Sequence, residues 1–189
     1  MVESKNYQKI SRYISYLLRH CPDEGNLEMD EHGWVDVDRL INHLRKTYRD
    51  FCKKYLDEIV RSDNKQRYSF NSDYTKIRAN QGHSIEVDLQ LINQKPPKYL
   101  YHGTGIKYVD SIEKNGICKQ SRQYVHLSNN TKTAQDVGKR HGAPILITIL
   151  AEKMFEDGYE FYLSDNKVWL TDYVPTKYIH NIDLFNGGL

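Results

Sequence analysis

The chain changes character at Pro96-Pro97, and this change limits the folds available to it. Neither proline can donate a backbone hydrogen bond, so the pair is typical of a stiff connection rather than of a helix or strand interior. Before the pair, apolar residues recur at helical spacing, whereas short β-prone runs alternate with helical ones after it. This pattern predicts an α+β protein with two lobes, one over residues 1–95 and one over residues 98–189.

The first lobe is expected to contain three helices followed by a hairpin. The apolar spacing predicts helices over residues 6–20, 37–47 and about 50–62, and Asp36 is a suitable N-cap for the second. Two β-prone runs then flank Asn71-Ser72-Asp73, which predicts a short hairpin loop. Three helices followed by a hairpin indicate a winged-helix lobe.

The second lobe is expected to be α+β with short strands. Its β-prone runs cover residues 99–102, 124–127, 144–150, 160–163 and 168–170. Helical runs cover about 106–114 and 131–140, and Gly116 follows the first of these at the position where glycine commonly ends a helix.

Composition and cysteine spacing exclude several classes of protein. The net charge of +2 is far from the basic excess of a non-specific nucleic-acid binder, so any anion site must be local. The basic run Arg45, Lys46, Arg49, Lys53 and Lys54 is open to two interpretations, a solvated face or a nucleic-acid contact.

The 3 cysteines are far apart and form no CxxC pair, and the 8 histidines form no HExxH motif. No metal site is therefore predicted, and a reducing, cytoplasmic setting is expected, or a nuclear one in a eukaryote. No membrane-length apolar run occurs, and we expect a monomer.

The stretch "YISYLLRHCPDE" ends the first predicted helix on Arg19 and His20. At about 100° per residue, Arg19 points almost opposite the apolar face and His20 falls at the edge of that face. Pro22 biases Cys21 away from helical geometry, so the helix ends here. We interpret this end as the start of a functional site.

Further short polar clusters place Arg or His beside Gly, Ser or Thr at the ends of predicted elements. Arg offers a planar fork of donors for phosphate oxygens, Gly allows close approach of backbone N–H groups, and hydroxyls add donors. Together the clusters are typical of a site for a multiply phosphorylated ligand. They are "LLRH", "DNKQRYSF", "IRANQGHS", "YHGT", "SRQYVHLS" and "VGKRHG".

In this order, and with "VWLTDYVP" after them, the clusters resemble the RNA 2′-phosphotransferases, the tRNA 2′-phosphotransferase or KptA family, over about residues 11–179. The resemblance implies a winged-helix RNA-binding lobe and an ADP-ribosyltransferase-like lobe that binds NAD. It implies removal of an internal RNA 2′-phosphate, such as that left by tRNA ligation. The RNA phosphate attacks NAD with loss of nicotinamide, and the ADP-ribosylated RNA then yields 2′-OH RNA and ADP-ribose cyclic phosphate.

The resemblance also implies residue roles. The family's Arg-His-Arg-Arg catalytic set maps onto Arg19, His20, Arg67 and Arg122, with Arg78 as a rival to Arg67. The positions that map onto the NAD site are His102, Gly103, Thr104, Gly116, Ser128, Arg140 and His141. RNA substrate contacts map onto Arg78, Gln81, His83 and Ser84.

Two alternatives remain at this point. The same residues would serve an ADP-ribosyltransferase that acts on terminal phosphates of nucleic acid. The basic run at 45–54 would also suit a non-catalytic winged-helix regulator.

Overall fold

The chain folds into two compact units, residues 1–90 and 91–189. The computed structural model describes residues 4–184, with side chains from Tyr7 onward. Both units combine helices with antiparallel sheets, so the predicted α+β class is confirmed. No helix among the described residues is long and apolar enough to cross a membrane.

The division between the units comes earlier than the diproline. The backbone N–H of Gln94 donates to the carbonyl of Phe161 at 2.9 Å, and Lys95 forms an ion pair with Glu152 at 2.7 Å. Pro96 is buried. These contacts attach the diproline segment to the second unit, whereas the sequence had suggested a connection at 95–98.

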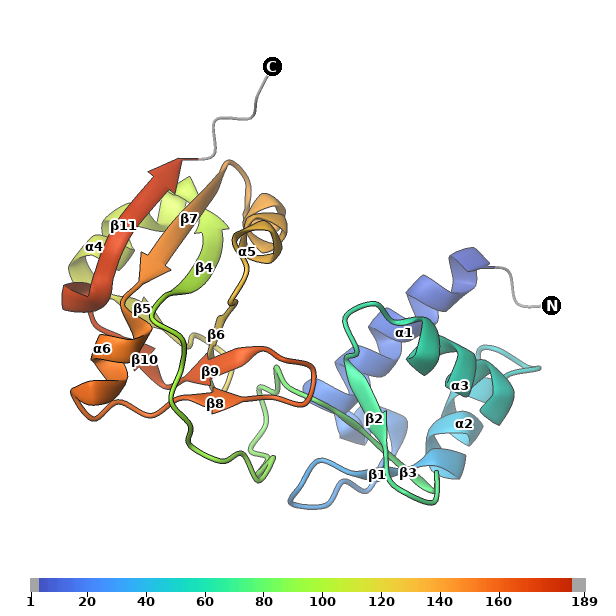
Figure 1. Ribbon diagram of the computed structural model, residues 1–189. Helices are drawn as coiled ribbons and strands as arrows, with labels where there is room; N and C mark the ends of the chain where they lie inside the picture. The colour runs from blue at the N-terminus through green and yellow to red at the C-terminus, as the bar shows by residue number, and fades with distance from the viewer. Residues whose placement is uncertain (1–3, 185–189) are drawn as a thin grey trace. The chain divides into compact units, whose positions relative to one another are not determined.

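The first unit contains the three predicted helices and the hairpin (Figure 1). Its elements, in chain order, are α1 (Ser4–Arg19), the 3₁₀ turn η1 (Pro22–Gly25), β1 (Val35–Asp36), α2 (Val37–Arg45), α3 (Lys53–Ser62), β2 (Tyr68–Phe70) and β3 (Lys76–Ala79). The strands pair in the order β1-β3-β2. As predicted, the Asp36 side chain caps α2 by accepting the Arg39 N–H at 2.8 Å.

The core of this unit follows the predicted helical faces. Ile10, Ile14, Leu17 and Leu18 of α1 are all fully buried. The third helix begins at Lys53, so its predicted start near residue 50 was wrong. Cys52 is extended, and the preceding Phe51 is buried outside the helix, where its carbonyl accepts a hydrogen bond from the Arg45 side chain at 2.8 Å.

The described residues of the second unit, 91–184, form three small antiparallel sheets. Its first elements are β4 (Leu100–Gly105), η2 (Ile106–Tyr108), α4 (Val109–Asn115), β5 (Ile117–Cys118), β6 (Val125–Leu127), α5 (Thr131–Gly138) and η3 (Lys139–His141). The remaining ones are β7 (Pro144–Ile149), α6 (Ala151–Glu156), β8 (Tyr162–Leu163), β9 (Trp169–Thr171), β10 (Tyr173–Val174), η4 (Thr176–Tyr178) and β11 (Ile179–Leu184).

The sheets pair strands that are distant in the sequence, in the orders β11-β7-β4, β6-β9-β8 and β10-β5. Figure 1 shows α5 packed beside β4 and β7. The five predicted strands and both helical runs are present. Four further elements were not predicted, namely β5, α6, β10 and β11.

Candidate functional site

The end of α1 joins two of the polar clusters found in the sequence. The helix stops at Arg19, and the backbone N–H groups of His20 and Cys21 both donate to the Tyr16 carbonyl. The Ser84 N–H donates to the Arg19 carbonyl at 3.0 Å, and His20 Nδ1 lies 2.8 Å from Ser84 Oγ in a hydrogen bond. The "LLRH" and "QGHS" segments therefore form one local structure.

Gly82 lets this local structure close. Its φ of +91° lies in the region that favours glycine, and a Cβ there would lie 3.4 Å from Cζ and Nε of Arg19. The guanidinium of Arg19 thus lies directly against the glycine backbone. Gln81 precedes Gly82 in the same loop and is partly buried.

Arg67 approaches the same region from the start of β2. Burial raises the pKa of the neighbouring Tyr68, and the nearby cations Arg19 and Arg67 act against that shift. Both guanidinium groups are therefore close to one buried phenol. The Tyr68 hydroxyl is itself held by the Ser11 carbonyl, to which it donates at 2.5 Å. This geometry places Arg67 with Arg19.

Asp63 orients Arg67. Its carboxylate forms an ion pair with Nη1 of Arg67 and accepts the backbone N–H groups of Arg67 and Lys65 at 2.7 and 3.2 Å. The Asp63 side chain is only 7% exposed, compared with 30% for that of Arg67. The pair therefore exposes the cation rather than the acid, and Arg67 can present its remaining donors to an anion.

Arg78 belongs to the same group but is held differently. It lies on β3 opposite Ser69, and its Cζ is 4.5 Å from the centre of the Trp34 ring. A cation–π contact of this kind fixes the guanidinium plane without neutralising its charge. The backbone N–H of Asn80, two residues later, donates to the Arg67 carbonyl at 2.8 Å. Arg67 and Arg78 are thus both part of this cluster.

His83 lies beneath these cations. The residue is 1% exposed, and neither ring nitrogen has a hydrogen-bond partner among the described residues. Burial, then the charges of Arg19, His20 and Arg78, lower the pKa of His83 to about 4. The ring is therefore neutral at physiological pH. We call Arg19, His20, Arg67, Arg78, His83 and Ser84 the first cluster.

A second cluster forms in the other unit, around the predicted NAD-site residues. His102 on β4 is partly buried, and its Nδ1 is 3.1 Å from the His126 carbonyl. Burial lowers the pKa of His102, and the charges of His141 and Arg122 add to that effect. Partial burial and the nearby Arg140 likewise lower the pKa of the Arg122 guanidinium. Four of these residues therefore lie close together, and we call them the second cluster: His102, Arg122, Arg140 and His141.

The second cluster carries unneutralised positive charge. Neither Arg122 nor Arg140 forms an ion pair within residues 4–184. Two guanidinium groups this close together attract an anion of two or more charges.

Close packing of β4 against α5 and η3 positions this cluster. A Cβ on Gly103 would lie 1.6 Å from the Ala134 carbonyl oxygen of α5, and one on Gly105 would lie 2.3 Å from the His141 carbonyl oxygen. Glycine at these positions therefore lets the backbone of η3, which carries Arg140 and His141, approach the end of β4. Thr104 between them is buried.

Comparison with known proteins identifies the family. The family model described as RNA 2′-phosphotransferase, Tpt1 / KptA family, matches residues 5–173. The chain belongs to the RNA 2′-phosphotransferase family. All the predicted site residues of both clusters lie within the matched segment.

Curated relatives with the name "Probable RNA 2′-phosphotransferase" are similar over almost their whole length. The protein from Fusobacterium nucleatum is 51% identical over 92% of this chain and 98% of its own. The protein from Nostoc punctiforme is 52% identical over 92% of this chain and 96% of its own. The one from Flavobacterium johnsoniae is 48% identical over 91% and 94%.

Two residues assigned through the family resemblance have local structural duties. Gly116 ends α4 with a φ of +73°, and a Cβ there would lie 2.3 Å from the Val174 carbonyl oxygen. Ser128 pairs with Tyr101 through backbone hydrogen bonds, and its hydroxyl donates to the Asn130 carbonyl at 3.0 Å in the turn before α5. These contacts explain both residues structurally and place Ser128 opposite β4, beside His102.

Sequence reasoning missed three residues that support this family's predicted site. Gly105 sets the approach of η3, Asp63 orients Arg67, and Trp34 holds Arg78. Asp63 had a usable signal, because it lies four residues before Arg67 and just after a predicted helix. Trp34 had none, because its contact depends on the pairing of β1 with β3.

Proposed function

We propose that this member of the family is an NAD-dependent RNA 2′-phosphotransferase. It would transfer an internal RNA 2′-phosphate to NAD through an ADP-ribosylated RNA intermediate, and tRNA is the expected RNA. The observation that carries the proposal is the first cluster, which combines three arginines with the hydrogen-bonded pair His20 and Ser84. Arg19 lies near Tyr68 together with Arg67, and near His83 together with Arg78. This donor set suits a phosphate dianion.

The cluster's main duty would be to bind and orient the RNA phosphate. The 2′-phosphate is already anionic and needs no general base to act as a nucleophile. Positioning and charge neutralisation are then the useful contributions. Arginines supply both, because they stay protonated at any physiological pH and one guanidinium can donate to two phosphate oxygens at once. The neutral His83 behind them adds no competing charge.

His20 is the proposed proton carrier. Departure of the RNA 2′-oxygen in the second step requires a proton near neutral pH, and an imidazole is suited to that transfer. Ser84 Oγ, 2.8 Å from His20 Nδ1, would fix the ring so that Nε2 faces the substrate. This hydrogen bond supports His20 as the acid and Ser84 as the residue that orients it.

The second cluster would bind the pyrophosphate of NAD. Arg122 and Arg140 offer unpaired guanidinium groups within the described chain, and the glycines of β4 leave backbone close to them. Arg122, His102, Arg140 and His141 would bind the dinucleotide, and Arg122 would also supply the fourth member of the catalytic set. NAD itself would supply an electrophilic ribose carbon with nicotinamide as its leaving group.

Two further expectations from the resemblance belong to this proposal. The first unit, with its three helices and β1-β3-β2 sheet, would be a winged-helix RNA-binding lobe. The second unit would be an ADP-ribosyltransferase-like NAD-binding lobe.

The test is an assay with NAD and a short RNA that carries an internal 2′-phosphate. We expect release of nicotinamide, a 2′-OH RNA and ADP-ribose cyclic phosphate, each identified by mass. A stable ADP-ribosylated RNA as the end product would instead support the transferase that acts on nucleic-acid phosphates. RNA binding without consumption of NAD would refute the proposal and favour a non-catalytic regulator.

A further inference from the structure

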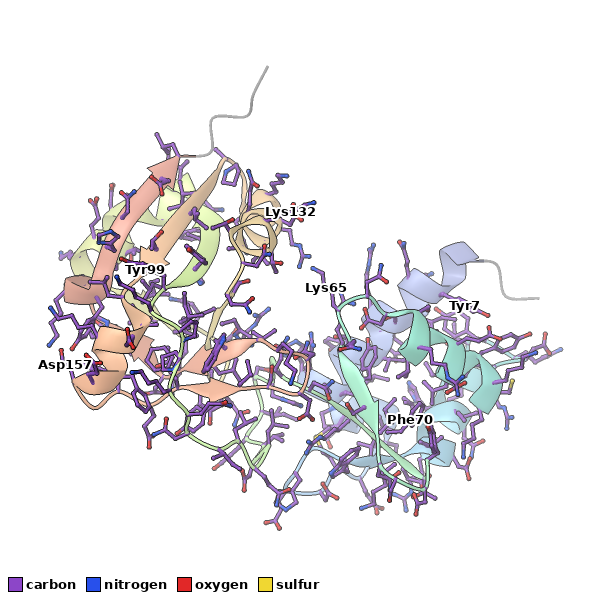
Figure 2. All side chains as sticks on the ribbon, viewed as in Figure 1. Tyr7, Lys65, Phe70, Tyr99, Lys132 and Asp157 are labelled. Carbon is purple, nitrogen blue, oxygen red and sulfur yellow. The ribbon has the colours of Figure 1, made fainter. Side chains whose placement is uncertain are left out.

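The first unit contains a second basic surface that the first cluster does not use. Part of the basic run noted in the sequence lines a hollow of about 360 Å³ between α3 and the hairpin. We call it the α3–hairpin hollow, and it is lined by Lys53, Lys54, Asp57, Arg61, Phe70 and Tyr74. Phe70 is labelled at the end of β2 in Figure 2.

The charge of the hollow is positive and largely available. Arg61 forms an ion pair with Asp57 at 2.9 Å, which leaves Lys53 and Lys54 as the uncompensated cations. Both lysines are exposed, and neither has an ion-pair partner in residues 4–184. By contrast, Arg45 of the same basic run donates to the Phe51 carbonyl and so serves the fold.

The position of these lysines is unfavourable for the helix. Lys53 and Lys54 occupy the first turn of α3, which contains no acidic residue, and Cys52 provides no side-chain cap. The positive end of the helix dipole disfavours cations there, and helices usually place Asp or Glu in this turn. A local choice that lowers helix stability without a structural return is expected at functional surfaces.

The aromatic side of the hollow shows a similar conflict. Tyr74 has a φ of +60°, a conformation that is uncommon for a bulky residue, and its residue surface is 48% exposed. Hydrogen bonds of the turn hold it there, since the Tyr74 N–H donates to the Asn71 carbonyl at 3.1 Å and Asp73 accepts the Thr75 N–H at 3.0 Å. The Tyr74 ring lies against Phe70, with 5.3 Å between the ring centres.

An exposed aromatic ring beside unpaired lysines is the combination that binds single-stranded nucleic acid, because bases stack on the ring and phosphates contact the cations. Acidic peptides would use the lysines but would have no need of the ring. The same strand links the hollow to the first cluster, because Arg67 precedes β2 and Phe70 ends it. Three residues of extended chain span about 10 Å, a distance that a few nucleotides also cover.

We propose that the α3–hairpin hollow binds a single-stranded RNA segment that flanks the 2′-phosphorylated nucleotide. Tyr74 stacks on a base of this segment, and Lys53 and Lys54 contact its phosphates. The proposal rests on the proposed function only in taking RNA as the substrate, and it adds that the protein prefers a phosphorylated nucleotide within a longer unpaired strand.

The test compares two RNAs that carry the same 2′-phosphate, a dinucleotide and a 12-nucleotide single strand. Binding to the full chain is measured by fluorescence anisotropy over a range of salt concentrations. Tyr74→Asn removes the ring while keeping a residue that tolerates positive φ, and we expect roughly tenfold weaker binding of the long RNA. Tyr74→Phe should restore it, and dinucleotide binding should stay unchanged in both variants.

The Lys53→Ala/Lys54→Ala variant should reduce the slope of log K against log salt by about 1.4 for the long RNA, since each single-strand phosphate contact contributes about 0.7. The matched control is Lys46→Ala/Arg49→Ala, which removes the same charge from exposed positions outside the hollow. We expect the control to keep at least most of the parental slope.

Three outcomes would overturn the proposal. They are equal effects of the control and the lysine variant, equal effects on the dinucleotide and the long RNA, and full competition by an acidic peptide in spite of the intact Tyr74. Turnover of the dinucleotide with NAD is measured in parallel. This second readout tests the proposed function, so failure of either idea is distinguishable from failure of the other.

Discussion

Replacement of Gly103 by alanine should separate β4 from α5. The added Cβ would lie 1.6 Å from the Ala134 carbonyl oxygen, whereas real Cβ atoms essentially never come within 3.0 Å of a heavy atom outside their own residue and its two chain neighbours. The helix must therefore move by at least about 1.4 Å in an interior packed as densely as an organic crystal. Because the obstacle is backbone rather than a flexible side chain, a rotamer change cannot relieve the contact.

The magnitude follows from known costs of overpacking. Such insertions destabilise proteins by about 1–3 kcal/mol, and a backbone obstacle favours the upper end. For a domain of roughly 100 residues, each kcal/mol lowers Tm by about 4–8 °C, so we expect a decrease of roughly 12–24 °C. The binding of NAD that the proposed function requires should weaken as well, because Arg140 and His141 follow α5 directly.

Two neighbouring glycines provide a graded series. A Cβ on Gly105 would lie 2.3 Å from the His141 carbonyl oxygen in the short η3 turn, so Gly105→Ala should be destabilising but less so. A Cβ on Gly138 would lie 3.0 Å from the Thr104 carbonyl oxygen. Gly138 ends α5, and alanine there regains up to about 1 kcal/mol of helix propensity, so Gly138→Ala should be nearly neutral.

The assay is thermal unfolding followed by tryptophan fluorescence in the full chain. The chain has 2 tryptophans, Trp34 in the first unit and Trp169 in the second, so a Trp34→Phe background reports on the second unit alone. A Trp169→Phe background should show an unchanged first unit. The reasoning is refuted if Gly103→Ala and Gly138→Ala lower the Tm of the second unit equally, or if Gly103→Ala leaves this Tm unchanged.

Three further predictions concern the first cluster. Burial lowers the pKa of His83 from 6.5 to about 4, so its contribution to the free energy of unfolding should be complete above pH 6.5 and decrease by on the order of 3 kcal/mol as the pH drops toward 4. Urea titrations should show this loss, and His83→Phe should make the free energy of unfolding less dependent on pH over this range. Arg67→Lys should lower kcat/KM by roughly 10²–10³, because the point charge of an ammonium replaces the paired donors of a guanidinium. A larger loss with Arg78→Lys would instead assign the catalytic role to Arg78. His20→Ala should slow the second step more than the first, and equal loss of both steps without an ADP-ribosylated RNA on a gel would contradict its role.

The periodicity of the sequence was sufficient to predict the helices of the first unit. Residues Ile10, Ile14, Leu17 and Leu18 are buried as expected, because a helical face depends only on spacing within the helix. The start of α3 at Lys53 was not predictable in the same way. Phe51 reaches the core from outside the helix, so its apolar character suggested a helical residue without requiring one.

Strands and site partners depended on contacts between distant residues. The pairing of β11 with β7 and of β10 with β5 joins segments with weak local patterns, and only the pairing makes them strands. Likewise, the sequence left Arg67 and Arg78 as rivals. The structure places both in the first cluster, since Arg67 lies with Arg19 near Tyr68 while Arg78 stacks on Trp34.

The residue types of the site and their order can be read from the amino-acid sequence, because phosphate recognition requires arginines, glycines and hydroxyls. Which of these residues meet, and in what charge state, depends on the folded chain. The contact of His20 with Ser84 and the neutral state of His83 both require the "QGHS" loop to fold back onto the end of α1. Burial and proximity are properties of the folded chain, and no local pattern encodes them.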